Sequence, residues 1–216
     1  MILLVAATEK ELQAYTEISQ RAGDVITLVS GIGAVESTLN LSRFLSTAQG
    51  ANVQKVIHFG VGGAFQGLGL DLLDICLAEK EILADFGICW GERTEPFDFL
   101  SQDTWQVKLD QQMLQQAGTI LRQLEIPNHS GNFITVNGVS GHACRGNQFR
   151  DRYQAICENM EGFGVARVCQ QFQVSCLEIR CISNMVEDRN RQAWKIPEAC
   201  RALGTVVSDL VKELQK

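Results

Sequence analysis

Proline is scarce in this chain of 216 residues, with only three, and no repeat or low-complexity tract is visible. Nothing in the composition marks a linker between domains, and 45% hydrophobic residues suffice to bury one core. Long hydrophobic runs are absent too, and the chain opens on a strand-like run at 2–7 rather than on a basic leader. We therefore expect a single domain over residues 1–216, located in the cytoplasm, with no membrane partner.

An excess of positive charge is also lacking. The chain holds 19 Lys and Arg against 25 Asp and Glu, a formal net charge of −6, and its basic residues are scattered. Because such a surface does not attract a phosphate backbone, nucleic acid is not an expected partner. No glycine-rich segment convincingly fits the dinucleotide fingerprint and none carries a Walker lysine. We expect no nucleotide cofactor and disfavour an oxidoreductase.

The eight cysteines include no C-x-x-C pair, and no histidine stands at zinc-finger spacing from them. Several lie inside apolar runs, where a free thiol packs as a small hydrophobic side chain. We expect no metal site, and reduced, buried thiols in a reducing compartment.

Strand and helix patterns alternate along the chain, as is typical of an α/β layer fold. The apolar periodicity predicts strands at 2–7, 25–29, 56–59, 73–77, 132–135 and 176–183, and helices at 9–20, 35–45, 163–171 and 197–214. The stretch 87–100 has no periodicity and is expected to be a long loop. Glycine-rich turns at 30–33 and 60–63 leave strands on the side where open α/β sheets bind ligands.

Three polar side chains stand at strand ends or helix starts. Glu11 follows Thr8 by three residues, which fits a capping box, but a carboxylate at the first strand's end can also be a general base toward water. Glu161 precedes an apolar helix, where the helix dipole alone favours an acid. Asn184 ends an apolar strand and is a common turn residue. For each of these three residues, the local sequence fits both a structural and a functional role.

The order of these segments resembles the purine nucleoside phosphorylase and nucleosidase superfamily over essentially the whole chain. The matching segments are the two glycine-rich turns, Ala6-Ala7-Thr8-Glu9-Lys10-Glu11, Met160-Glu161 and Arg180-Cys181-Ile182-Ser183-Asn184. The stretch from Arg180 to Trp194, with Arg189, is most similar to the futalosine hydrolase branch, which serves an alternative menaquinone pathway. The resemblance implies a single domain with a central mixed sheet flanked by helices. It also implies a homo-oligomer that hydrolyses a 6-oxopurine nucleoside, futalosine, to hypoxanthine and dehypoxanthine futalosine.

The resemblance further implies residue roles. Glu11 matches the residue that activates water, Glu161 the residue that binds the sugar hydroxyls, and Asn184 the residue that recognises the base. These roles suit N-ribosyl cleavage, in which positive charge develops on the sugar and negative charge on the departing base. The remaining expected substrate contacts are Met160, packed on the ribose, with Gly62, Phe163 and Ile32.

Two departures from the family pattern concern the base. Methylthioadenosine nucleosidases carry Asp where this chain has Asn184, which leaves open how the base is protonated. The loop that stacks an aromatic ring on the purine falls at 135–141, which contains no aromatic residue. Phe163 is a candidate for this role, and the stacking side chain stays open. His142 and Arg145 are weaker candidates for the distal end of the substrate, and His58 is expected to be structural.

Three other functions stay open. A phosphorylase would need arginines near the early glycine turns, but the first 60 residues hold only Arg21 and Arg43. A methylthioadenosine-type nucleosidase is the second alternative. The third, from a different class, is a non-catalytic nucleoside-binding protein, against which the presence of both Glu11 and Glu161 argues.

Overall fold

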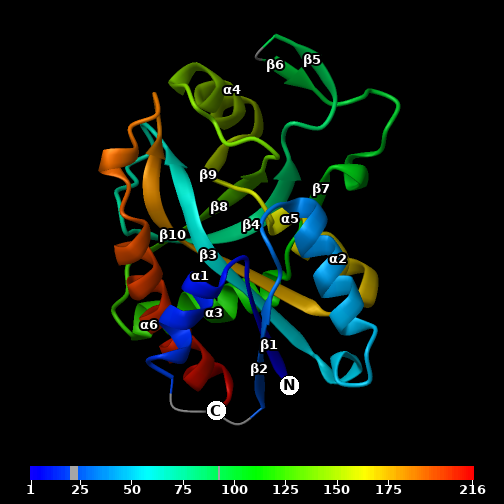
Figure 1. The fold of residues 1–216 in the computed structure, drawn as a ribbon, viewed down its shortest axis with the longest axis vertical. Helices are drawn as coiled ribbons and strands as arrows, with labels where there is room; N and C mark the ends of the chain where they lie inside the picture. Colours follow the sequence, from blue (N-terminus) through cyan, green and yellow to red (C-terminus); the bar gives the residue numbers. More distant parts are fainter. Residues whose placement is uncertain (20–23, 92) are drawn as a thin grey trace.

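The computed structural model describes residues 1–19, 24–91 and 93–216, and its centre is a mixed sheet of eight strands (Figure 1). These strands are β1 (Ile2–Ala6), β2 (Val25–Val29), β3 (Lys55–Phe65), β4 (Ile75–Leu83), β7 (Gln106–Lys108), β8 (Asn128–Thr135), β9 (Ala155–Asn159) and β10 (Ser175–Val186). The mixed sheet and its flanking helices confirm the expected α/β fold.

Five of these strands close into a ring. β10 runs parallel to β3 and antiparallel to β4, β8 runs parallel to both β4 and β9, and β9 runs antiparallel to β3. From β3 the sheet continues in parallel through β1 to β2, and the short β7 pairs with β4. Because β1, β3 and β10 are parallel, their carboxyl ends point the same way, which is where ligands bind in such sheets.

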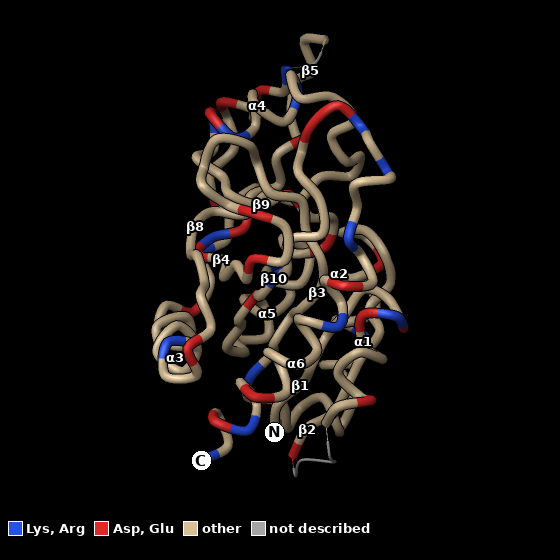
Figure 2. Tube along the Cα trace, turned by 90° about the vertical axis from the view of Figure 1, so that its left-hand side faces the viewer, with Lys and Arg blue, Asp and Glu red and all other residues tan. Residues whose placement is uncertain are grey.

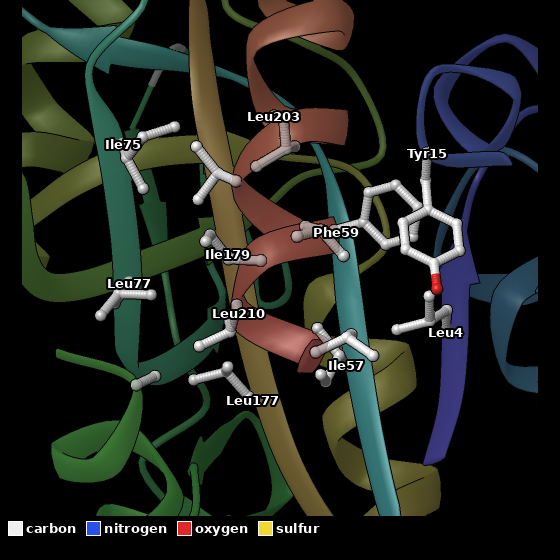
Figure 3. Packing of buried hydrophobic residues seen from close by; sticks show 14 of the residues in the cluster. Leu4, Tyr15, Ile57, Phe59, Ile75, Leu77, Leu177, Ile179, Leu203 and Leu210 are labelled. Carbon is white, nitrogen blue, oxygen red and sulfur yellow. The ribbon is translucent and has the colours of Figure 1, made fainter. Parts of the chain in front are cut away.

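Helices cover both faces of the sheet. They are α1 (Glu9–Thr16), α2 (Ala34–Leu45), α3 (Gln111–Gln123), α4 (Ala143–Tyr153), α5 (Gly162–Phe172) and α6 (Ile196–Leu214). On one face α1, α3 and α6 share a core with the strands, in which Leu203 and Leu210 of α6 pack over Ile57, Phe59 and Ile179 (Figure 3). On the other face α2 and α5 pack on β1 and β3. Both faces of the central strands are therefore buried, which explains their continuous apolar runs.

Two of the expected elements are wrong. β3 continues to Phe65, so the glycines at 60–63 lie inside a strand rather than in a turn. The stretch 87–100 is not a plain loop, because β5 (Ile88–Trp90) and β6 (Arg93–Glu95) form a two-stranded antiparallel sheet there. Most of this hairpin is exposed, so it has no buried face to impose an apolar alternation on the sequence.

Charge and thiols are distributed as follows. Figure 2 shows Lys and Arg scattered among Asp and Glu along the chain. Six cysteines are buried, whereas Cys89 and Cys144 are exposed. In the part of the chain that the structure describes, no three potential metal ligands come together, and no helix has the length and apolar content needed to cross a membrane.

Candidate active site

A cavity of about 400 Å³ opens at the carboxyl ends of β1 and β9 and beside the bulge in β10. Its walls also include the middle of β3, the segment after β8 and the starts of α1, α5 and α6. Six of the seven predicted site residues line it, although they come from distant parts of the sequence: Glu11, Ile32, Gly62, Met160, Glu161 and Asn184.

Glu11 is only 8% exposed, and both of its carboxylate oxygens are engaged. Its Oε2 accepts hydrogen bonds from the backbone N–H (3.0 Å) and the hydroxyl (2.8 Å) of Thr8, which completes the predicted capping box. Its Oε1 accepts the backbone N–H of Val61 on β3 at 3.0 Å. The capping interpretation is therefore confirmed, and the same carboxylate also faces the cavity, where it can accept a proton from water.

Glu161 is 5% exposed and does not cap the helix that it precedes. Its Oε1 accepts the backbone N–H of Gly33 at 3.0 Å, and its Oε2 lies 3.7 Å from Nη1 of Arg180. Burial raises the pKa of Glu161, while Arg180 and the Gly33 N–H act in the opposite direction. The carboxylate is held at the cavity wall beside Met160.

The capping of α5 is performed by other residues. Oδ1 of Asn159 accepts the backbone N–H groups of Glu161 (3.0 Å) and Gly162 (2.7 Å), and the hydroxyl of Thr135 accepts that of Phe163 at 2.8 Å. These bonds satisfy the start of the helix without the side chain of Glu161. Glu161 still stands at the N-terminus of α5, where the helix dipole favours an acid, and its carboxylate bonds Gly33 rather than the helix.

Arg180 is fully buried behind the two carboxylates. Its guanidinium forms an ion pair with Glu178 at 2.9 Å, donates to the carbonyl of Val61 at 3.3 Å and faces the ring of His58. Burial, and then Arg180, lower the pKa of His58, so this ring is neutral. Glu178 and the Val61 peptide thus fix Arg180 beside Glu161. His58 contacts Arg180 and does not line the cavity.

The glycine at position 60 leaves room for this arrangement. A Cβ there would lie 2.5 Å from Nη1 of Arg180 and 2.6 Å from Oε1 of Glu11. We expect Gly60→Ala to displace both groups, to lower the catalytic rate and to cost about 1–3 kcal/mol of stability. Gly118→Ala is the matched control, because a Cβ at this position in α3 meets nothing and should stabilise by about 0.5–1 kcal/mol. A Gly60→Ala protein as stable and active as wild type in thermal melts and assays would refute this packing.

Asn184 lies within β10, so the interpretation as a turn residue is wrong. The strand bulges between Ile182 and Asn184, which turns the side chain of Asn184 toward the cavity. Its Oδ1 accepts the hydroxyl of Ser183 at 2.9 Å and its Nδ2 donates to the carbonyl of Met185 at 3.2 Å. The side chain is half-buried, and its second amide hydrogen is available to a ligand.

Phe163 is the predicted site residue that the structure places outside the cavity lining. Its side chain is buried in a core cluster with Phe133 and Ile182, because α5 packs against the sheet at this point. Trp194, which precedes α6, is the aromatic side chain that does line the cavity, and the guanidinium of Arg189 lies 4.9 Å from the centre of its ring. The only pointer to Trp194 in the sequence is its place in the 180–194 stretch.

The two candidates for the distal end do not line the cavity either. His142 is exposed, 3.6 Å from Asp188. Arg145 donates to the carbonyl of Gly138 at 2.7 Å and lies 3.5 Å from Asp85. These contacts stabilise the segment that follows β8.

Cations are few around the cavity. Among its lining residues in the described ranges, Lys10 is the only one with a positive charge, because Arg180 lies behind the wall. Arg43 is in the last turn of α2, and Arg21 lies outside the described residues. A phosphate nucleophile would need several cations aimed at its oxygens, so this lining favours water.

A model of the Phosphorylase superfamily matches residues 7–216. A futalosine hydrolase of Acidothermus cellulolyticus is 30% identical over 177 residues, which are 82% of this chain and 70% of that protein. One of Thermus thermophilus is 30% identical over 190 residues, covering 86% and 80%. The structure of a futalosine hydrolase mutant of Helicobacter pylori has a TM-score of 0.84 at 21% identity, covering 98% of both chains, which is a likeness of fold.

Proposed function

Because the chain belongs to the phosphorylase superfamily, we propose that it hydrolyses futalosine, a 6-oxopurine nucleoside, to hypoxanthine and dehypoxanthine futalosine. The chain is an N-glycosyl hydrolase, as its motifs predict. The relatives that match it at 30% identity over most of its length are futalosine hydrolases, and this supports the choice of substrate. With this substrate the enzyme serves the alternative route to menaquinone.

The observation that carries the proposal is the convergence of two buried carboxylates on one cavity. Glu11 and Glu161 lie far apart in the sequence and are linked through shared neighbours. The Val61 N–H binds Glu11, and the Val61 carbonyl accepts from Arg180, which lies 3.7 Å from Glu161. A nucleoside in this cavity therefore meets a carboxylate on either side of the Val61 peptide.

These carboxylates suit the charge that N-glycosidic cleavage creates. Positive charge develops on the sugar as the bond to the base breaks, and a nearby carboxylate stabilises it. Glu11 takes a proton from the attacking water, and Glu161 accepts hydrogen bonds from the sugar hydroxyls. Met160, next to Glu161 in the lining, packs on the ribose. Asn184 donates to the base, where negative charge accumulates.

We expect Glu161→Gln to lower kcat/KM about tenfold to a hundredfold, because the loss of charge weakens the bonds to the sugar hydroxyls. A 2′-deoxy substrate lacks one of these hydroxyls and should lose much less on the same substitution. Steady-state kinetics on the ribo and deoxy forms measure the difference. Equal losses on both substrates would show that Glu161 acts elsewhere in the reaction.

The substrate is tested with four nucleosides: futalosine, aminofutalosine, inosine and methylthioadenosine. Each is incubated with the protein, with and without phosphate, and free base is scored by chromatography. We expect futalosine to be cleaved fastest. Faster cleavage of methylthioadenosine would favour the methylthioadenosine-type alternative, and binding of nucleosides without release of base would favour a binding protein.

We also expect a homo-oligomer. Ile32, which lines the cavity, is 61% exposed, and Val35 and Leu39 on the adjoining helix α2 are 74% and 58% exposed. This apolar strip at the cavity mouth supports the expectation, because single chains rarely leave such groups together in water. Light scattering after size exclusion measures the mass in solution.

A further inference from the structure

A third buried carboxylate lines the cavity and has no role in the steps above. Glu158, at the end of β9, is 6% exposed. Its Oε1 accepts the backbone N–H of Ser140 at 2.9 Å, and its Oε2 accepts the hydroxyl of Ser140 at 2.6 Å. Each oxygen retains a further lone pair. Burying a carboxylate is costly, so a second partner from the cavity side is physically favourable.

The sheet register places Glu158 opposite Asn184. Gly63 of β3 is paired with Glu158 on one side and with Asn184 on the other. Residues directly opposite one another in a sheet project from the same face. Glu158 and Asn184 therefore flank Gly63, with their Cα atoms about two strand spacings, or roughly 10 Å, apart.

Gly63 keeps the space between these two side chains open. A Cβ at this position would lie 3.0 Å from Nδ2 of Asn184. Because Gly63 has no Cβ, the backbone of β3 is open to the cavity between the carboxylate of Glu158 and the amide of Asn184, which both line it. A flat heterocycle with polar groups on two edges fits over Gly63, with one edge toward Glu158 and the other toward Asn184.

We propose that Glu158 determines specificity for the base, by accepting the N1–H of a 6-oxopurine while Asn184 donates to its O6 or N7 edge. This inference rests on the proposed function, which puts a nucleoside in the cavity. A 6-oxopurine carries a hydrogen on N1, whereas a 6-aminopurine presents a bare acceptor there. Burial raises the pKa of Glu158, but the N–H and hydroxyl of Ser140 donate to its two oxygens and so favour the ionised form. An ionised carboxylate only accepts, so a 6-aminopurine sets two acceptors against each other. Such a buried mismatch reduces kcat/KM by on the order of a hundredfold.

The competing explanation is that Glu158 only stabilises the segment that follows β8, through its hydrogen bonds to Ser140. Two substitutions separate these roles. Glu158→Gln retains an oxygen for Ser140 but replaces one acceptor with a donor. Ser140→Ala removes the hydroxyl bond to Glu158 and leaves the carboxylate in the cavity. If Glu158 only stabilises this segment, both substitutions should change the cleavage of every substrate in the same way.

The experiment compares wild type, Glu158→Gln and Ser140→Ala on futalosine, N1-methylfutalosine and aminofutalosine. In wild type, N1-methylation should reduce kcat/KM about a hundredfold, because the N1–H is lost. Glu158→Gln should slow futalosine cleavage tenfold or more and should shift the ratio of futalosine to aminofutalosine turnover toward aminofutalosine. Ser140→Ala should leave that ratio unchanged. Equal effects of the two variants on all three nucleosides would overturn the inference while leaving the proposed function intact.

Wild-type protein alone provides a second test that does not depend on the folding of a variant. Hypoxanthine should raise the melting temperature, whereas 1-methylhypoxanthine should raise it much less, since ligand binding to the folded state stabilises it. Equal shifts for both bases would overturn the role of Glu158. If wild type cleaves none of the three nucleosides, the proposed function itself fails, which is a different result from an unchanged base preference.

Discussion

Replacement of Glu11 by Gln is expected to lower the rate of nucleoside cleavage by at least roughly a hundredfold, because the amide cannot accept a proton from the attacking water. The substitution keeps the size of the side chain. It also has a structural cost, since Oε1 and Oε2 of Glu11 accept from Val61 and Thr8 respectively. A Gln has one acceptor oxygen, so one of these two sets of bonds is lost, at about 1–2 kcal/mol of stability.

Two measurements separate catalysis from capping. Thermal melts give the stability loss of Glu11→Gln, and assays well below the melting temperature give the rate of the folded enzyme. Glu9→Gln is the matched control, because Glu9 is an exposed acid in the same first turn of α1. We expect it to leave the rate unchanged. Near wild-type activity of Glu11→Gln would mean that Glu11 is only a capping residue.

Replacement of Asn184 by Asp is expected to slow futalosine cleavage steeply and to shift the preference toward aminofutalosine. In the proposed function the amide donates to the keto oxygen or to N7 of hypoxanthine, where negative charge builds, whereas an ionised Asp only accepts. Mismatched buried polar pairs of this kind cost up to several orders of magnitude in selectivity. An Asp would still accept the hydroxyl bond of Ser183, so we expect the bulge in β10 to persist.

The ratio of futalosine to aminofutalosine turnover decides the role of Asn184. Asn190→Asp is the control, because Asn190 is exposed and its side-chain oxygen caps the next helical turn, which an Asp can also do. It should change neither rate nor ratio. If Asn184→Asp alters stability but leaves the ratio unchanged, Asn184 does not recognise the base.

Much of the fold could be predicted from the sequence, because the buried strands have continuous apolar runs. The predictions for β1, β2 and β10, and for helices α2, α5 and α6, agree with the structure to within a few residues. The helices α3 and α4 were not predicted. In α3 the buried positions Met113, Leu114, Ala117 and Leu121 have helical spacing, but glutamines between them dilute the pattern. In α4 the buried positions are few: Gly146, Phe149 and Tyr153.

The cavity lining could be predicted largely through motif order rather than through local pattern. Local pattern alone left Glu11, Glu161 and Asn184 each with a structural explanation. The structure removes that explanation for Asn184, which lies inside β10. Glu161 does stand at the start of α5, but its side chain makes no capping bond to the helix. For Glu11 the structure confirms the capping box and places the same residue in the cavity wall.

Other features depend on tertiary contacts that no short window of sequence contains. Arg180 alternates with apolar residues in a strand, and only the fold shows that Glu178 and Val61 hold it beside Glu161. Glu158 is one more polar residue at a strand end until the register through Gly63 sets it opposite Asn184. Phe163 illustrates the reverse case, since an apolar residue near a motif was assigned to the site and packs in the core.

The central claim is that water, activated inside this cavity, cleaves a 6-oxopurine nucleoside. The most direct test measures kcat/KM for futalosine in phosphate-free buffer and again after phosphate is added, with both products identified by mass. We predict hypoxanthine and the free sugar product, dehypoxanthine futalosine, at the same rate in both buffers. Strict dependence on phosphate with formation of a sugar 1-phosphate, or failure to release hypoxanthine at all, would contradict the claim.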